Sequence, residues 1–187
     1  MRLGLLYKCT IRRFMSRKVN MVICGLDAST SCTGWSIFDN DKLIAYGAIK
    51  PKGDDWHDRV MGLTMELSRI FRQYQPTIIY AEEVPLKKGA STIEKLGAVQ
   101  GVILALCAGF KIKPCFLMPS KWRGDLNLFD GTRAGLQRDV LKKKAIEMAN
   151  EEFGLELAWV APSSKKNEDD CAEGILIAYS QIKKKGV

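Results

Sequence analysis

The sequence is poor in the residues that build zinc sites. It has one histidine, His57, and its six cysteines show no Cys-x-x-Cys pair and no zinc-like spacing. Two of the cysteines, Cys24 and Cys107, lie in apolar runs, where free thiols behave as small hydrophobic side chains. We therefore expect reduced cysteines, as in intracellular proteins, and no zinc chemistry.

Acidic residues are absent from the first 20 positions, which carry six Lys and Arg residues. The rest of the chain has 23 basic and 21 acidic residues, so most of the net charge of +8 comes from this segment. We expect residues 1–20 to be a flexible or dispensable basic arm; a targeting segment and an extension upstream of a start at Met15 or Met21 are the alternatives. Residues 21–187 have the size of one domain. The total charge alone is then weak evidence for nucleic-acid binding.

The chain also lacks an uninterrupted apolar run of about 20 residues, the length that crosses a bilayer. Its longest apolar stretch, residues 98–110, is interrupted by Gln100. We therefore expect a soluble protein with no membrane partner. The spacing Gly97-x-x-x-Gly101 would favour helix pairing in a membrane, but in water it indicates a close-packed core helix, part of which could form an interface.

Hydrophobic periodicity predicts strands and helices in an order typical of α/β proteins. Short apolar runs predict strands over residues 22–26, 33–39, 42–49, 77–81 and 113–118, with a hairpin turn at Asn40 and Asp41. Helical spacing of apolar residues predicts helices over residues 60–74, 91–107, 138–153 and 169–182. Three successive strands followed by alternation with helices predict an α/β fold, with one mixed sheet covered by helices on both faces.

Acidic side chains stand at the ends of two of the apolar strands. Asp27 follows the run VICGL, and Glu82 and Glu83 follow TIIYA. Burying a lone carboxylate is costly, and neighbouring strands lie about 4.8 Å apart, so two such strand ends can share one divalent cation. Ordinary strand ends that face solvent are the alternative.

A further acidic pair lies in the segment NEDDCAEGILIA. Asp170 and Glu173 are three residues apart and therefore share one helix face. The alternative is a helix start capped by Asn167, with acids that favour the helix dipole, but Glu173 lies deeper than a cap and directly precedes an apolar run. Together with the strand-end acids, this pair makes an oxygen-only ligand set, which selects Mg²⁺ or Mn²⁺. Two such ions can support phosphodiester cleavage.

Three segments resemble one known family when taken together: GLDASTSCTG at 25–34, IYAEEV at 79–84 and DCAEGILIA at 170–178. They resemble the RuvC-like Holliday-junction resolvases of the RNase H-like superfamily, in particular the forms carried by bacteriophages, over about residues 21–182. The resemblance implies an RNase H-like five-stranded mixed sheet, a homodimer, and a site with two Mg²⁺ or Mn²⁺ ions. It implies a cytoplasmic, phage-encoded enzyme of DNA recombination and repair. Such an enzyme nicks opposite strands of a four-way junction and leaves 5′-phosphate and 3′-hydroxyl ends.

The resemblance also assigns residues, with two departures from the family pattern. The implied catalytic metal ligands are Asp27, Glu82, Asp170 and Glu173. Glu83 and Asp169 are rivals for the roles of their neighbours. Glu173 stands where cellular members usually have aspartate, and the segment VPLKKG after Glu82 lacks the aromatic residue thought to wedge into the junction. Forks, flaps and other branched DNA are therefore further candidate substrates.

Basic residues cluster in segments that follow the proposed ligands, where DNA phosphates need positive charge. The candidate DNA contacts are Lys87, Lys88, Trp122, Arg123, Arg133, Arg138, Lys142 and Lys143. Arg123 and Lys142 lie near the positions of two functional lysines in the family. Trp122 could stack on a base or pack in the core. The lysines at 142–144 could instead form a solvated helix face.

Three other functions are compatible with the same sequence. Another RNase H-like nuclease, acting on flaps, forks or RNA–DNA hybrids, would use the same acids. The segment DASTSCTG also resembles the phosphate loop of actin-like kinases and ATPases, although 187 residues leave little room for the second lobe which that class needs. A catalytically silent junction binder is the third alternative.

Overall fold

The computed structural model describes residues 21–84 and 89–185. The predicted basic arm at 1–20 lies outside the described residues, as do Lys87 and Lys88, two of the candidate DNA contacts.

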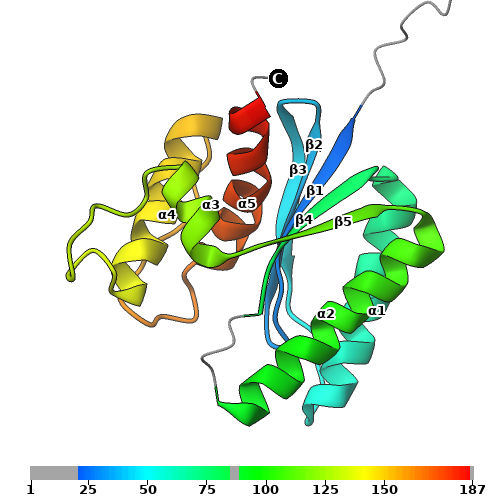
Figure 1. Ribbon diagram of the computed structural model, residues 1–187. Coiled ribbons are helices and arrows are strands. Elements are labelled where there is room, and N and C mark those ends of the chain that lie inside the picture. Colours follow the sequence, from blue (N-terminus) through cyan, green and yellow to red (C-terminus); the bar gives the residue numbers. More distant parts are fainter. Residues whose placement is uncertain (1–20, 85–88, 186–187) are drawn as a thin grey trace, which may run out of the picture.

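Five strands form one mixed sheet in the order β3-β2-β1-β4-β5 (Figure 1). The strands are β1 (Val22–Asp27), β2 (Thr33–Asp39), β3 (Lys42–Ile49), β4 (Ile78–Glu82) and β5 (Lys113–Leu117). β1 pairs with β2 and β2 with β3 in antiparallel directions, whereas β4 lies parallel to both β1 and β5. The predicted α/β fold with a mixed five-stranded sheet is confirmed.

Helices cover both faces of this sheet (Figure 1). The helices are α1 (Trp56–Tyr74), α2 (Ala90–Phe110), α3 (Pro119–Asp125), α4 (Arg138–Phe153) and α5 (Asp169–Lys185). α1 and α2 lie on one face, and α3, α4 and α5 lie on the other. The result is three layers, with a hydrophobic core on each side of the sheet.

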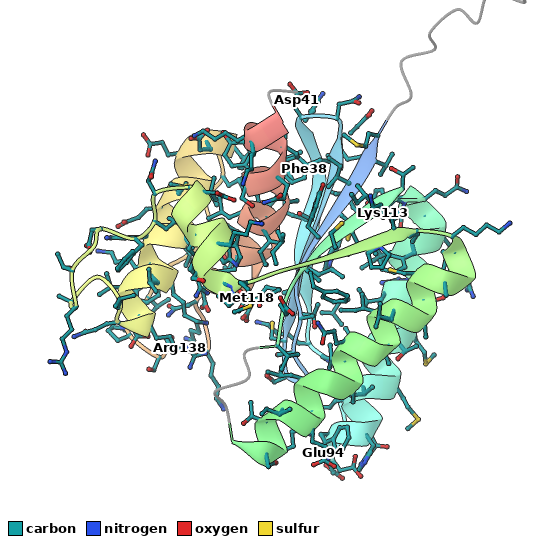
Figure 2. All side chains as sticks on the ribbon, in the orientation of Figure 1. Phe38, Asp41, Glu94, Lys113, Met118 and Arg138 are labelled. Atoms are coloured by element: carbon teal, nitrogen blue, oxygen red, sulfur yellow. The ribbon has the colours of Figure 1, made fainter. Side chains whose placement is uncertain are left out.

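Alternation along the strands divides the apolar side chains between the two cores. Ile23, Phe38 and Tyr80 belong to the core on the α5 side, whereas Cys24 and Ile79 belong to the core under α1 and α2. Figure 2 shows side chains filling both layers, with Phe38 between the sheet and α5. Successive side chains of a strand point to opposite faces. The alternation also determines toward which face of the sheet the side chain of the last residue of each strand points.

Local signals in the sequence account for the bounds of α1. The Asp55 side chain accepts hydrogen bonds from the backbone N–H groups of His57 and Asp58, which have no partner inside the helix. At the other end, Gln75 adopts a left-handed conformation with φ of 48°. Pro76 follows and cannot continue the helix.

α2 differs from the expected core helix. Of its 21 residues only Val99, Ile103 and Cys107 are buried. Within the described chain, nothing lies within 4 Å of the positions that Cβ atoms would take on Gly97 and Gly101. The prediction that this glycine pair packs closely in the core is therefore wrong for the single chain. Gly97 and Gly101 lie on an exposed face of α2. α2 is also longer than the apolar run read from the sequence, and by length and composition alone it could cross a membrane.

The short helix α3 is absent from the sequence prediction. Pro119 ends β5 as expected, but it also occupies the first position of α3, where a missing N–H costs nothing. Met118 marks the point where β5 passes into α3 (Figure 2). α3 carries Trp122 and Arg123, two of the candidate DNA contacts.

Candidate active site

Two of the candidate carboxylates come from neighbouring strand ends. β1 and β4 are parallel and pair Leu26 with Ala81, so Asp27 and Glu82 follow at the same edge of the sheet. Leu26 and Ala81 both belong to the core under α1 and α2. Alternation therefore turns Asp27 and Glu82 to the opposite face, toward α5.

Glycines bring α5 close to this face of the sheet. A Cβ atom on Gly34 of β2 would overlap the backbone carbonyl of Asp170, and one on Gly25 of β1 would overlap that of Gly174. The Ser36 hydroxyl donates a hydrogen bond to the same Gly174 carbonyl over 2.8 Å. The first turns of α5 therefore rest directly on β1 and β2, and their acidic side chains lie beside the strand ends.

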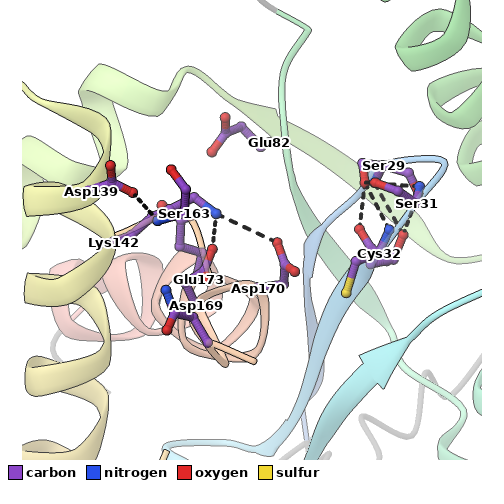
Figure 3. Close-up of polar contacts among 12 residues, drawn as sticks. Ser29, Ser31, Cys32, Glu82, Asp139, Lys142, Ser163, Asp169, Asp170 and Glu173 are labelled. Carbon is purple, nitrogen blue, oxygen red and sulfur yellow. Dashed lines mark hydrogen bonds and ion pairs between the residues drawn. The ribbon is translucent and has the colours of Figure 1, made fainter. Parts of the chain in front are cut away.

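The four acids form one electrostatic cluster. The pKa of Asp27 is raised well above its usual value, first by burial. The negative charges of Glu173, Glu82 and Asp170 raise this pKa further, and Lys142 opposes them. Glu173 is only 4% exposed, so it points into the fold, as expected from its place before the apolar run. Figure 3 shows Glu82, Asp170 and Glu173 around one space between the sheet and α5.

Arg123 contributes positive charge to this cluster from α3. Its Nη2 lies 2.7 Å from Oε1 of Glu173 and 3.7 Å from Oε2 of Glu82. Burial would lower the pKa of Arg123, but the charges of Glu173 and Glu82 outweigh it and raise this pKa above its usual value. The guanidinium therefore remains charged beside the two carboxylates.

The rival acids Asp169 and Glu83 have contacts of their own. Asp169 is buried and forms an ion pair with Lys142, whose Nζ also lies 4.0 Å from Oδ1 of Asp170 (Figure 3). Glu83 lies beyond the end of β4, where its backbone N–H continues the pairing with β5. Neither rival is among the charges that raise the pKa of Asp27. Their neighbours remain the proposed ligands.

Trp122 does not reach the surface, contrary to its assignment as a DNA contact. Its side chain is 0% exposed, and its indole N–H donates a hydrogen bond to Oε2 of Glu82 over 3.1 Å. The Arg123 guanidinium carbon lies 4.8 Å from the centre of the same ring. The alternative of core packing is correct. The hydrogen bond to Glu82 could not be predicted without α3, which places Trp122 beside this acid. Pro119, a residue favoured at the first position of a helix, is the sequence signal for α3.

The other predicted DNA contacts differ in their surroundings. Arg133, Arg138 and Lys143 are exposed. Figure 2 shows Arg138 at the beginning of α4. Arg123 and Lys142 have carboxylate partners, and their side chains are only 22% and 16% exposed. Lys143 is exposed but also lies 3.5 Å from Oε1 of Glu147. Arg133 and Arg138 can meet a phosphate as they stand, whereas the paired residues would first have to separate from an acid.

The turn between β1 and β2 is compact and polar. The Ser29 hydroxyl donates a hydrogen bond to the Cys32 carbonyl over 2.6 Å and accepts from the backbone N–H groups of Ser31 and Cys32 (Figure 3). The Ser29 N–H in turn donates to Oγ1 of Thr33. The small side chains of this segment are thus used within the turn, directly after Asp27.

The donor set fits a hard divalent cation. All four candidate ligands are carboxylates, which suit Mg²⁺ or Mn²⁺. Their negative charge is only partly balanced, because Lys142 is paired with Asp169 outside the set. Within residues 21–84 and 89–185, no three carboxylate, imidazole or thiol groups are already gathered into a metal-binding cluster. Binding of a cation would therefore require these side chains to rearrange.

Comparison with known sequences agrees with this geometry. The family model described as crossover junction endodeoxyribonuclease RuvC matches residues 23–121. The protein of that name from Nitratidesulfovibrio vulgaris is 31% identical over 105 residues, which cover 54% of this chain and 63% of that protein. The match thus spans a little less than two thirds of this relative.

Solved structures share the fold over most of the chain. T. thermophilus RuvC in complex with a Holliday junction substrate has a TM-score of 0.68 at 14% identity, covering 89% of this chain and 96% of that chain. The Fowlpox virus resolvase in complex with Holliday junction DNA has a TM-score of 0.54 at 17% identity, covering 88% and 98%. These similarities confirm the RNase H-like fold. Because the family model matches more than half of the 187 residues, the chain belongs to the RuvC family.

Proposed function

We propose that this protein is a structure-selective endodeoxyribonuclease that resolves Holliday junctions by metal-dependent hydrolysis of phosphodiester bonds. The observation that carries the proposal is the convergence of four carboxylates from β1, β4 and α5 on one space beside the sheet. Membership of the RuvC family supports it, and so do two solved neighbours whose structures contain Holliday junction DNA.

The four carboxylates would hold the metal, which we propose to be two Mg²⁺ or Mn²⁺ ions. When bound, such ions supply an activated water and stabilise the leaving oxygen, giving 5′-phosphate and 3′-hydroxyl ends. The chain's own part is to hold the oxygen donors at fixed positions. Asp27 and Glu82 end buried strands, and Trp122 donates a hydrogen bond that orients Glu82. The absence of a side chain at Gly34 allows the backbone of α5 at Asp170 to pack directly against β2, beside these strand ends.

Exposed basic residues would bind the DNA backbone. Arg133, Arg138 and Lys143 lie on the segment leading into α4 or on α4 itself, on the same side of the sheet as the acids. Lys142 lies within 4.0 Å of Asp170 and would meet the phosphate nearest the site. Lys87 and Lys88 follow Glu82 in sequence and remain proposed contacts. These charges would give affinity without sequence readout.

We propose a homodimer formed through the outer face of α2. Gly97, Gly101, Leu104 and Ala108 share one helix face. Leu104 is 47% exposed, and the glycines have open space around them within the described chain. Small residues allow two helices to approach closely. Two sites in one dimer would suit paired cuts on opposite strands, and a covered face would account for an apolar helix in a protein that acts on DNA in the cytoplasm.

A panel of labelled DNA substrates tests the activity directly. With Mg²⁺ or Mn²⁺ the protein should cut a four-way junction in preference to a linear duplex, and a chelator should abolish cutting. Equal cutting of linear duplex would overturn junction selectivity. Preferred cutting of a flap, a fork or an RNA–DNA hybrid would instead identify the protein as another RNase H-like nuclease.

The Asp27→Asn variant separates catalysis from binding. We expect it to bind the junction with wild-type affinity, measured by gel shift, and to show no metal-dependent cleavage. Cleavage by this variant would show that Asp27 is not a metal ligand.

Calorimetric binding of ATP, with no effect of metal on DNA cutting, would favour the actin-like alternative. The resemblance of three segments to resolvases carried by bacteriophages supports a phage origin for the protein.

A further inference from the structure

Arg123 lies between two of the proposed metal ligands. Its Nη2 is 2.7 Å from Oε1 of Glu173 and 3.7 Å from Oε2 of Glu82. The side chain of Arg123 is 22% exposed, and those of Glu82 and Glu173 are 21% and 5% exposed. Charges sheltered from water to this degree interact more strongly than charges at the surface.

The contacts of this guanidinium are incomplete. Both contacts use the same nitrogen, Nη2. The buried Nε of Arg123 has no hydrogen-bond partner among the described groups. An arginine in a permanent ion pair often presents two parallel N–H groups to one carboxylate, and a buried donor without a partner costs free energy. The geometry therefore indicates a guanidinium held by its charge, in a position that it can leave.

The other cation of the cluster serves a different acid. Lys142 pairs with Asp169 and lies near Asp170. Arg123, in contrast, forms ion pairs with both Glu82 and Glu173. A divalent cation bound by these two glutamates would lie within a few ångströms of the guanidinium, where like charges repel.

We propose that Arg123 is a built-in counter-ion of the metal site, which holds Glu82 and Glu173 together in the metal-free protein and is displaced when a divalent cation binds. The inference rests on the proposed function and adds a competition to it. Metal affinity is lower than the carboxylates alone would give, because each binding event displaces an arginine. The displaced guanidinium becomes available to a DNA phosphate, so metal loading and DNA binding favour each other.

Trp122 provides an internal reporter for this exchange. Its indole N–H donates a hydrogen bond to Glu82, and the centre of its ring lies 4.8 Å from the guanidinium carbon of Arg123. Departure of the guanidinium removes a cation–π contact from a fully buried ring. We expect a change in tryptophan fluorescence on addition of metal to the full chain in the absence of DNA.

Metal titration of an Arg123→Gln variant tests the proposal. In calorimetry with Mg²⁺ or Mn²⁺ and no DNA, this variant should bind metal about tenfold more tightly than wild type, since a nearby positive charge has been removed. In EDTA its melting temperature should fall, because Glu82 and Glu173 lose their counter-ion. These two shifts have opposite signs, which mere loss of packing would not produce. Unchanged or weaker metal binding by Arg123→Gln would overturn the proposal.

Two further variants complete the test. Lys144→Gln removes a basic residue that is paired with Asp130 outside the acidic cluster, and it should leave metal affinity unchanged. Arg123→Lys keeps the charge and covers the case in which Arg123→Gln does not fold; its metal affinity should stay within about threefold of wild type. A large rise in affinity for Arg123→Lys would contradict the role of charge. All readouts are made without DNA, so a failure of junction cleavage would leave this result standing, and a failure here would leave the nuclease proposal standing.

Discussion

The indole N–H of Trp122 lies 3.1 Å from Oε2 of Glu82 and joins a fully buried residue of α3 to the acid that ends β4. The Trp122→Phe variant keeps an aromatic ring and removes this donor. We expect a drop in the cleavage rate of about tenfold, as Glu82 loses its fixed orientation, and a loss of about 1–3 kcal/mol in the free energy of unfolding. Single-turnover cleavage and urea unfolding measure the two effects.

A second tryptophan provides the control for this variant. Trp56→Phe changes the first residue of α1, which makes no contact with the acids among the described interactions, and should leave the cleavage rate unchanged. A Trp122→Phe protein that cleaves at the wild-type rate would show that the hydrogen bond does not position Glu82.

Asp27 should make the metal-free protein less stable as pH rises. Its pKa in the folded state lies well above the ordinary value of 3.8, so between these two values the folded state binds more protons than the unfolded state. The free energy of unfolding therefore falls as pH rises through this window. Asp27→Asn should flatten the decline, and urea unfolding in EDTA at several pH values measures it. Asp41→Asn, in the hairpin turn, is the control; an unchanged slope for Asp27→Asn would contradict the assignment.

The contact between Gly34 and α5 should tolerate no side chain. Gly34→Ala would force a Cβ atom into the backbone of Asp170, and we expect a loss of about 3 kcal/mol in stability together with loss of metal-dependent cleavage. Gly109→Ala, in α2, meets no described atom within 4 Å and should stabilise the helix by about 0.5–1 kcal/mol. Thermal unfolding of both variants decides the matter; equal stability of the two would show that α5 can move away from the sheet.

The proposed dimer depends on the outer face of α2. Leu104→Glu places a charge in the centre of this face and should give a monomer in analytical ultracentrifugation, with the fold retained by circular dichroism. The matched control is Met65→Glu on α1, since Met65 is an apolar residue with 73% exposure outside the proposed interface. A wild-type protein that is monomeric at micromolar concentration would reject the interface.

Backbone binding by α4 should depend on salt. Arg138→Gln removes one exposed charge at the start of the helix and should weaken binding to junction and duplex alike. The slope of log affinity against log salt should fall by about 0.9 if one phosphate contact is lost. Fluorescence anisotropy over a salt series measures this slope. A change for the junction alone would indicate a contact specific to the branch point.

Much of the site follows from the sequence because its pattern is local. Val22–Asp27 and Ile78–Glu82 are apolar runs that end in acid, and residues at the ends of parallel neighbours meet at one edge of a sheet. The three-residue spacing of Asp170 and Glu173 fixes their common helix face in the same way. These periodicities, together with the order of the elements, were sufficient to predict the fold and the four acids.

The tertiary structure alone decided what covers each residue. A seven-residue helix such as α3 has too few turns for a periodic pattern, so the burial of Trp122 and the pairing of Arg123 with Glu173 arise only when α3 packs against α5. The exposure of α2 was equally hidden, because an apolar sequence is the same whether its outer face meets a core, a second copy or solvent. Composition and spacing thus determined the elements and their acidic ends, while long-range packing determined the partners of those acids.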